Sequence, residues 1–180
     1  MTDAVHTTFL EPDAYPELAG IRAVWEELRD EALATRAEAF LITDGRAAPG
    51  TWSVLPLLPE EEDRHVFSEA ETARLRALAP RTVALLGQHE RVLAYAFSIL
   101  APGADIAQHR HHQPHVTASL CLQGGGTAIL TAGGEARPFV DGEWTVFDYT
   151  QPHSVINRGE LERIVLLVLL ERPDGFVSAS

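Results

Sequence analysis

From residue 91 onward, the sequence is a succession of short apolar segments separated by turns that are rich in glycine. Seven segments have the length and the β-branched or aromatic content of strands: residues 91–100, 115–122, 127–131, 137–140, 144–147, 154–157 and 163–170. Glycine clusters or an Asp-Gly pair separate several of them. Short strands at this spacing are typical of a sandwich or a jelly-roll barrel, so we predict a mainly β fold.

Three of these segments alternate between two kinds of side chain, as expected for strands with two different faces. Large apolar residues alternate with small or polar ones, which are Ala94, Ala96 and Ser98 in the first segment and His115, Thr117, Ser119 and Cys121 in the second. In the last segment, Arg163 begins an apolar stripe. A charge at this position needs a partner if it points inward, and an anionic ligand would serve. The alternatives are a solvated strand end or an ion pair with Glu160 or Glu162.

The first 88 residues are predicted to form helices and one short strand. Apolar residues recur at helical spacing over residues 16–40, and Ser68 with Glu71 is a capping box that opens a helix through Leu78. Residues 51–58 resemble a strand, residues 81–88 a further helix, and the acidic run 60–63 a solvated loop. We predict one domain over residues 1–180: an N-terminal helical layer (1–88), a β-barrel core (89–172) and a C-terminal tail (173–180).

Five of the eight histidines lie in two places: His109, His111, His112 and His115 form one cluster, and His153 stands before a predicted strand. Neutral imidazole is the commonest metal ligand, and open sites of two or three histidines suit iron, zinc or copper. On a strand, residues i and i+2 share a face, so the first two histidines of the cluster can point at one ion. The third should then point away. The alternative to a metal site is that these histidines form a solvated patch on the surface.

Composition excludes several classes of partner. The formal net charge of −12 argues against nucleic acid or an anionic membrane. The single cysteine rules out an internal disulfide and fits a reducing compartment. The chain opens without a secretory signal, and its longest apolar run, residues 164–170, is too short to span a bilayer. We expect a soluble cytoplasmic protein, and a homodimer is compatible with the sequence.

Several motifs together resemble the aspartyl/asparaginyl β-hydroxylase family of Fe(II)- and 2-oxoglutarate-dependent oxygenases. These motifs are residues 95–103, His109, residues 146–148 leading to His153, and residues 162–166, with weaker likeness at Trp52 and residues 79–82. The resemblance covers most of residues 50–172. It implies a double-stranded β-helix, which is a jelly-roll or cupin-like barrel. It also implies an enzyme that uses O2 and 2-oxoglutarate to hydroxylate a small, amino-acid-like substrate.

The resemblance also implies roles for individual residues. His109 and His153 match the family's two iron ligands, and Ser98 and Arg163 match the pair that holds the distal carboxylate of 2-oxoglutarate. Arginine suits this role because its planar fork meets a carboxylate through two hydrogen bonds. The chain departs from the family in the strand after the first histidine, where Arg-x-His is usual. The corresponding positions here are Thr117 and Ser119, which puts normal 2-oxoglutarate binding in question.

The additional histidines fit the cupin pattern, which shares the same fold. Gly103, His109, His111 and His115 have the spacing of the first cupin motif, with histidine in place of the usual glutamate. On this interpretation the metal ligands are His109, His111, His153 and also His115. The enzyme would then be a dioxygenase, isomerase or lyase that does not use 2-oxoglutarate. A third hypothesis is a non-enzymatic barrel that binds a small ligand.

Overall fold

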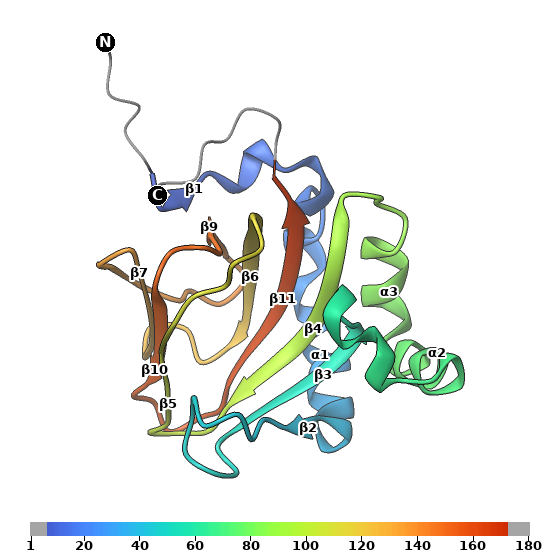
Figure 1. Cartoon of the computed structure of the whole chain (residues 1–180), viewed down its shortest axis with the longest axis horizontal. Helices are drawn as coiled ribbons and strands as arrows, with labels where there is room; N and C mark the ends of the chain where they lie inside the picture. Colours follow the sequence, from blue (N-terminus) through green and yellow to red (C-terminus); the bar gives the residue numbers. More distant parts are fainter. Residues whose placement is uncertain (1–6, 173–180) are drawn as a thin grey trace.

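The computed structural model describes residues 7–172 and is mainly β, with two antiparallel sheets that face each other and a few helices on one side (Figure 1). The predicted C-terminal tail, residues 173–180, lies outside the described residues. The predicted class, a double-stranded β-helix with an N-terminal helical layer, is confirmed. Strands from the N-terminal part also join the larger sheet, which therefore extends beyond the predicted core.

The larger sheet has seven strands in the order β1-β9-β6-β11-β4-β3-β2. Their bounds are Phe9–Leu10 (β1), Trp144–Asp148 (β9), His115–Gln123 (β6), Arg163–Glu171 (β11), Val92–Leu100 (β4), Trp52–Leu58 (β3) and Phe40–Leu41 (β2). In the centre, β11 pairs with β4 and β6, so that Val165 lies opposite Ser98, and Leu169 opposite Thr117. Residues that lie opposite each other point to the same face, and this register gathers the predicted cosubstrate residues on the inner face.

Both faces of the larger sheet are covered, which explains why β11 is almost continuously apolar. One set of alternate residues packs under the helices: Ile164, Leu166, Val168 and Leu170. The other set faces the smaller sheet: Arg163, Val165, Leu167 and Leu169. A strand that is buried on both faces has no solvent-exposed side, so apolar and polar residues do not alternate along it.

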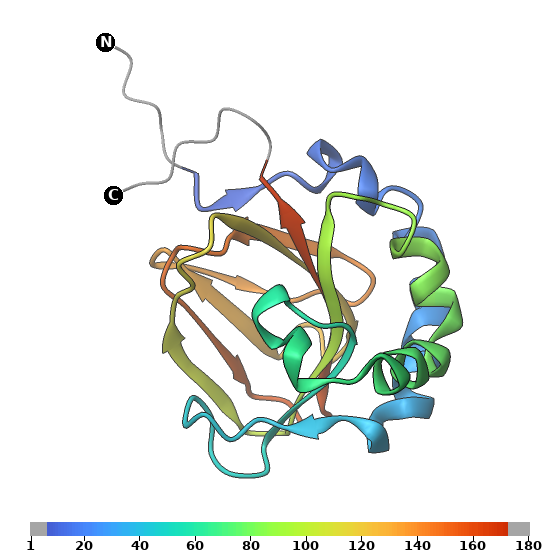
Figure 2. The same cartoon turned by 45° about the vertical axis from the view of Figure 1, so that its right-hand side comes forward.

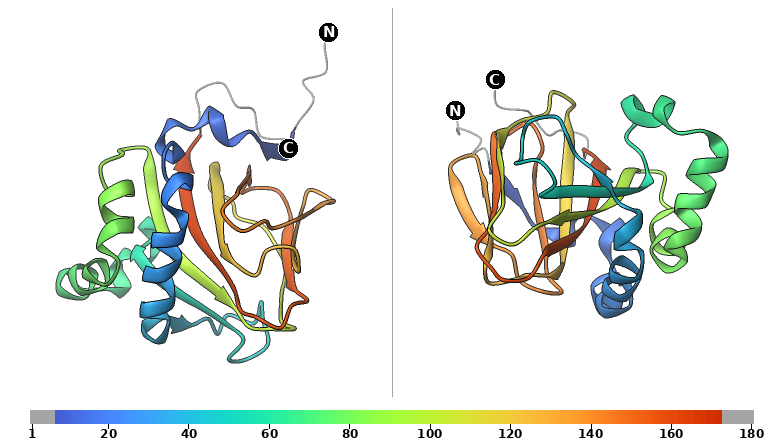
Figure 3. Two further views of the ribbon diagram at one scale, coloured as in Figure 1. Left: turned by 180° about the vertical axis from the view of Figure 1, so that it is seen from behind. Right: turned by 90° about the horizontal axis from the view of Figure 1, so that it is seen from below.

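Three α-helices cover the outer face of the larger sheet: Trp25–Thr35 (α1), Glu69–Leu78 (α2) and Pro80–Leu86 (α3). Figure 2 shows them on the side away from the smaller sheet, and from behind α1 lies across the larger sheet (Figure 3, left). The predicted capping box is present, because the Ser68 hydroxyl accepts a hydrogen bond from the Glu71 backbone N–H, and the Ser68 backbone N–H donates one to the Glu71 carboxylate. Among residues 7–172, no helix is both long and apolar enough to cross a membrane.

The continuous helix predicted over residues 16–40 is wrong. Only Trp25–Thr35 is α-helical, and short 3-10 turns lie at Pro16–Leu18, Arg22–Val24 and Arg36–Glu38. Gly20 interrupts the segment with a φ of +78°, a conformation that no helix residue adopts. At the other end, Phe40 leaves the helical region to pair with β3.

The smaller sheet has four strands in the order β5-β10-β7-β8: Asp105–His109, His153–Asn157, Ala128–Ala132 and Glu135–Pro138. β5 was not among the predicted strands, because Ile106 is its only large apolar residue. Its pairing with β10 sets His109 directly opposite His153. This register, which joins two distant segments, brings the two histidines together at one end of the sheet.

Candidate metal centre and cavity

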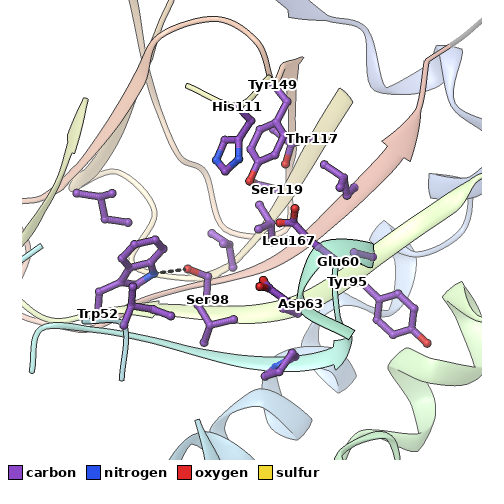
Figure 4. Close-up of a pocket in the computed structure, with 18 of the residues that line it drawn as sticks. Trp52, Glu60, Asp63, Tyr95, Ser98, His111, Thr117, Ser119, Tyr149 and Leu167 are labelled. Carbon is purple, nitrogen blue, oxygen red and sulfur yellow. Dashed lines mark hydrogen bonds between the residues drawn. The ribbon is translucent and has the colours of Figure 1, made fainter. Parts of the chain in front are cut away.

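A cavity of about 370 Å³ lies between the two sheets, and apolar residues from both sheets form most of its wall. Ala94, Ala96, Val165, Leu167 and Leu169 line it from the larger sheet, and Leu130 and Val155 from the smaller one. Polar groups enter it at a few points, and Figure 4 shows several of them pointing inward. Apolar cavities with a few convergent polar groups are the usual form of a small-molecule site.

Three histidines meet at one side of this cavity. Each of His109, His111 and His153 offers one ring nitrogen, and these nitrogens all lie within 4.8 Å of one another. The rings of His109 and His153 have centroids 4.3 Å apart, and those of His109 and His111 are 5.3 Å apart. His111 follows the end of β5 and is held there by a hydrogen bond from its backbone N–H to the Tyr149 carbonyl.

In two of these rings, a hydrogen bond determines which nitrogen is protonated and which is free to bind a metal ion. His109 Nδ1 lies 2.9 Å from the Ala107 carbonyl, and His153 Nδ1 lies 2.8 Å from the Gln151 carbonyl. A carbonyl only accepts, so each Nδ1 carries the proton and each Nε2 keeps a free lone pair. His111 Nε2 is buried and has no hydrogen-bond partner. Backbone carbonyls orient metal-binding histidines in this way, and the arrangement fits a metal ion.

Burial keeps all three rings neutral. It lowers the pKa of His111 to about 3 and of His153 to about 4, and it lowers the pKa of His109 as well. The imidazoliums would also repel one another, which lowers these values further. Neutral imidazoles with free lone pairs bind metals without first losing a proton.

The structure does not bring the other two histidines of the cluster into this group. His112 is exposed, in the direction that the sequence predicted. His115, included above as a fourth ligand, begins β6 in the larger sheet and lies opposite Glu171. The turn through Gln113 and Pro114 carries the chain from one sheet to the other, and this separates His115 from the three-histidine group.

Arg163 points inward and is only 2% exposed. Its Nη2 lies 3.4 Å from Ser98 Oγ, which also accepts a hydrogen bond of 3.0 Å from Trp52 Nε1. Within residues 7–172 Arg163 has no carboxylate partner, and its Nε is unpaired. Glu162, one of the alternative partners, pairs with Arg36 instead. Burial lowers the pKa of the guanidinium to about 10, so it stays charged at neutral pH.

Thr117 and Ser119 lie on the same inner face of β6 and line the cavity. Thr117 is fully buried, and its Oγ1 has no hydrogen-bond partner in the part of the chain that the structure describes. A buried hydroxyl without a partner is costly unless a ligand or water completes it. The cavity therefore presents donors on the larger sheet and histidines on the smaller one.

The comparison with known families gives a match to the aspartyl/asparaginyl beta-hydroxylase model over residues 22–173. The chain belongs to this family. A search of curated proteins found no match. The resemblance that the motifs predicted is thus confirmed, with most of the chain included.

Solved structures of other proteins have a similar fold, and several of them are described as cupin domains. A predicted oxalate decarboxylase from Thermotoga maritima is 19% identical, with a TM-score of 0.50 over 73% of this chain and 90% of that one. The cupin domain of an XRE-family transcriptional regulator from Enterobacter cloacae is 17% identical, with a TM-score of 0.45 over 68% of this chain and 99% of that one. At 19% identity, the likeness to the first of these structures concerns the fold alone.

Two cavity residues of this family member were not predicted from the sequence. Tyr149 stacks on His111 with ring centroids 3.7 Å apart and an interplanar angle of 9°. Glu60 lies beside the Tyr149 hydroxyl and is partly buried. The solvated loop predicted for residues 60–63 is therefore wrong at Glu60, because the segment turns into a 3-10 helix, Glu61–Val66, at the cavity. Neither residue has a local signature, since the fold alone brings both to the histidines.

Proposed function

We propose that this protein is a non-haem Fe(II) oxygenase that hydroxylates a small molecule with O2 and 2-oxoglutarate. One observation carries the proposal: a three-histidine group shares one cavity with a buried arginine that has no carboxylate partner among residues 7–172. The membership of the aspartyl/asparaginyl beta-hydroxylase family supports the reaction class.

His109 and His153 would hold the iron, with His111 as a third ligand. Their Nδ1–H groups donate to backbone carbonyls, which directs Nε2 toward the ion and limits rotation of the rings. Bound Fe(II), together with O2 and 2-oxoglutarate, supplies the oxidising chemistry that the side chains lack.

Arg163 and Ser98 would bind the distal carboxylate of 2-oxoglutarate. The guanidinium supplies charge and a planar fork, and the Trp52 hydrogen bond orients the Ser98 hydroxyl. Thr117 and Ser119 stand in place of the Arg-x-His of the family pattern and would contribute hydroxyl donors only. A weaker hold on the cosubstrate is expected, because two neutral groups replace a cation and an imidazole.

The apolar walls would position the substrate and keep water away from the reacting carbon. A cavity of about 370 Å³ is at the small end of ligand sites, which favours a free amino acid or a similar small molecule over a protein segment.

A second candidate function is a cupin-like metal enzyme that does not use 2-oxoglutarate. The proximity of His111 to the other two histidines favours it, since three neutral imidazoles form a more complete ligand set than two. Arg163 would then bind a carboxylate of the substrate itself.

Oxygen consumption and succinate formation distinguish the two candidates. Fe(II)-loaded protein should form succinate from 2-oxoglutarate even without the native substrate, at a slow uncoupled rate, and the Arg163→Lys variant should require more 2-oxoglutarate. Turnover of screened substrates that is independent of 2-oxoglutarate would favour the second candidate instead.

A further inference from the structure

An acidic segment forms part of the cavity wall beside Tyr149, the residue that stacks on His111. Glu60, Glu62 and Asp63 line the cavity, whereas Glu61 on the same short helix does not. Figure 4 shows the side chains of Glu60 and Asp63 extending from this segment toward the space between Tyr149 and Ser98. Three carboxylates therefore lie along one part of the cavity wall, with Glu60 partly buried and Glu62 and Asp63 exposed.

No basic side chain among the described residues forms an ion pair with Glu60, Glu62 or Asp63. Arg64, the nearest cation in sequence, donates to the backbone carbonyls of Pro59 and Leu93. Arg46 also lines the cavity, but it is paired with Asp44 at 2.5 Å. The guanidinium of Arg46 also lies over the Trp52 ring, 5.0 Å from its centroid. Its charge favours the ionised form of Glu60, but it forms no ion pair with that carboxyl.

Glu60 is the most constrained of the three. It is partly buried, and burial together with the charges of Glu62 and Asp63 raises the pKa of its carboxyl. Two groups from other parts of the fold act on this carboxyl, the Tyr149 hydroxyl through a hydrogen bond and Arg46 through its charge, and both favour its ionised form. Carboxylates that are crowded together without a cation are destabilising, and a bound cation would offset this cost.

A separate observation indicates that a polar ligand belongs in this cavity. Thr117 is 0% exposed, and its Oγ1 lacks a partner although it lines the same space. It comes from β6, on a different element from the acidic segment. Thr117, Ser119, Tyr149 and Glu60 all line this cavity, and Figure 4 labels them around it.

We propose that the cavity binds a small aliphatic molecule with a protonated amine, which forms an ion pair with Glu60 and is further attracted by Asp63. The apolar side chains of Phe40, Val66 and Leu167 also line the cavity and would contact the aliphatic part. Tyr149 joins the two regions, since its ring stacks on His111 and its hydroxyl lies beside Glu60. The inference rests on the proposed function in one respect, because the amine would be the substrate that is hydroxylated.

Binding of a matched pair of probes tests the proposal. Pentylamine and pentan-1-ol have the same chain, and only the amine is charged at pH 7. Ligand-observed NMR at physiological salt suits weak binding and screens the attraction of the protein's net charge of −12. In the unaltered protein, pentylamine should bind about 10-fold or more tightly than pentan-1-ol, the range of a charged hydrogen bond.

Two single-residue variants test whether the preference for the amine depends on Glu60. Glu60→Gln should abolish the preference for the amine, whereas Glu61→Gln removes the same charge outside the cavity and should leave the preference within about twofold. Glu60→Gln should fold normally, because it relieves the crowding of three carboxylates, and its melting temperature checks this. The proposal is overturned if the alcohol binds as well as the amine, or if Glu61→Gln weakens amine binding as much as Glu60→Gln. It is also overturned if pentylamine binds no more tightly than about 10 mM.

The outcome is separable from that of the proposed function. Amine binding is measured on metal-free and metal-loaded protein, and metal content is measured on the same samples. A lost amine preference with an intact, histidine-dependent metal site rejects only the amine. An intact preference in a protein that binds no metal rejects only the oxygenase.

Discussion

The two sheets of the barrel differ in burial and in the chemistry that they carry. The larger sheet is covered on both faces, and its central strand β11 is buried along nearly its whole length. The smaller sheet has short strands, and β8 at its edge is exposed throughout. Arg163, Ser98 and Thr117 belong to the first sheet, and His109 and His153 belong to the second. A deeply packed sheet thus carries the groups proposed to bind an anion, while two of the proposed metal ligands depend on the pairing of two five-residue strands.

This difference between the two sheets predicts that mutations in one sheet mainly affect stability and mutations in the other mainly affect the metal centre. Stability should come mainly from the larger sheet, because apolar burial is the dominant favourable contribution to folding. The metal centre should be sensitive to the smaller sheet, because the His109–His153 register sets its geometry. The predictions below test this separation, from the largest expected effect to the smallest.

Loss of either histidine from the smaller sheet should remove most of the bound metal. His109→Ala and His153→Ala each delete one of three ligands from an open site with little redundancy. Metal content of the purified variants measures this directly. His112→Ala is the matched control, because its side chain is exposed and should not alter metal content. Stoichiometric metal in the double variant of His109 and His153 would show that the ion binds elsewhere.

Truncation in the two sheets should have unequal effects on the free energy of unfolding. Leu166→Ala removes a fully buried side chain under the helices and should cost about 2–5 kcal/mol. Val155→Ala, at a partly buried position in β10, should cost about 1 kcal/mol. Urea unfolding of the metal-free proteins gives both values. A larger cost for Val155→Ala would reverse the proposed division of stability.

Acid should destabilise the metal-free protein through its buried histidines. The pKa values of His111 and His153 are lowered to about 3 and 4, so the unfolded chain binds more protons than the folded one below its ordinary pKa of about 6.5. Stability should therefore fall as pH decreases from about 6.5 to 4. His111→Phe keeps an aromatic ring against Tyr149 but cannot be protonated, and its stability should fall less over this range. Parallel pH profiles of the two proteins would rule out His111 as a source of the effect.

The helical layer should respond least. Ser68→Ala removes the side chain that caps α2 and should lower the free energy of unfolding by about 1 kcal/mol. Metal content should not change, because α2 lies outside the barrel (Figure 1). Thermal unfolding and metal analysis of one preparation check both statements. A loss of metal in this variant would mean that the helical layer, and not only the smaller sheet, supports the metal centre.

Patterns within single segments predicted much of the larger sheet. The alternation in β4, β6 and β11 reflects two different environments, and it also predicted the inner face that carries Ser98 and Thr117. The capping box at Ser68 was also predictable from the sequence, because both of its partners lie within four residues. The sequence pattern allows Arg163 to point inward or outward, and only the family resemblance favours the inward orientation. Local periodicity does not show what covers a strand end.

Features that depend on long-range pairing were less predictable. β5 has too few apolar residues to stand out, and its register with β10 cannot be derived from either segment alone. The approach of Tyr149 to His111 and of Glu60 to Tyr149 joins segments that are distant in the sequence. The acidic run also shows that charge alone is ambiguous, since one of its four residues is partly buried at the cavity while its neighbour is exposed.

Titration of the anaerobic Fe(II) protein with 2-oxoglutarate tests the central claim, that the two sheets bind the metal and the carboxylate separately. The unaltered protein should develop a visible charge-transfer band that saturates with added 2-oxoglutarate. Arg163→Lys keeps the charge but loses the planar fork, so it should need about 10-fold more 2-oxoglutarate with unchanged metal content. His109→Ala should give no band. A metal-loaded, unaltered protein without any band, or an Arg163→Lys variant with the same affinity for 2-oxoglutarate, would contradict this account.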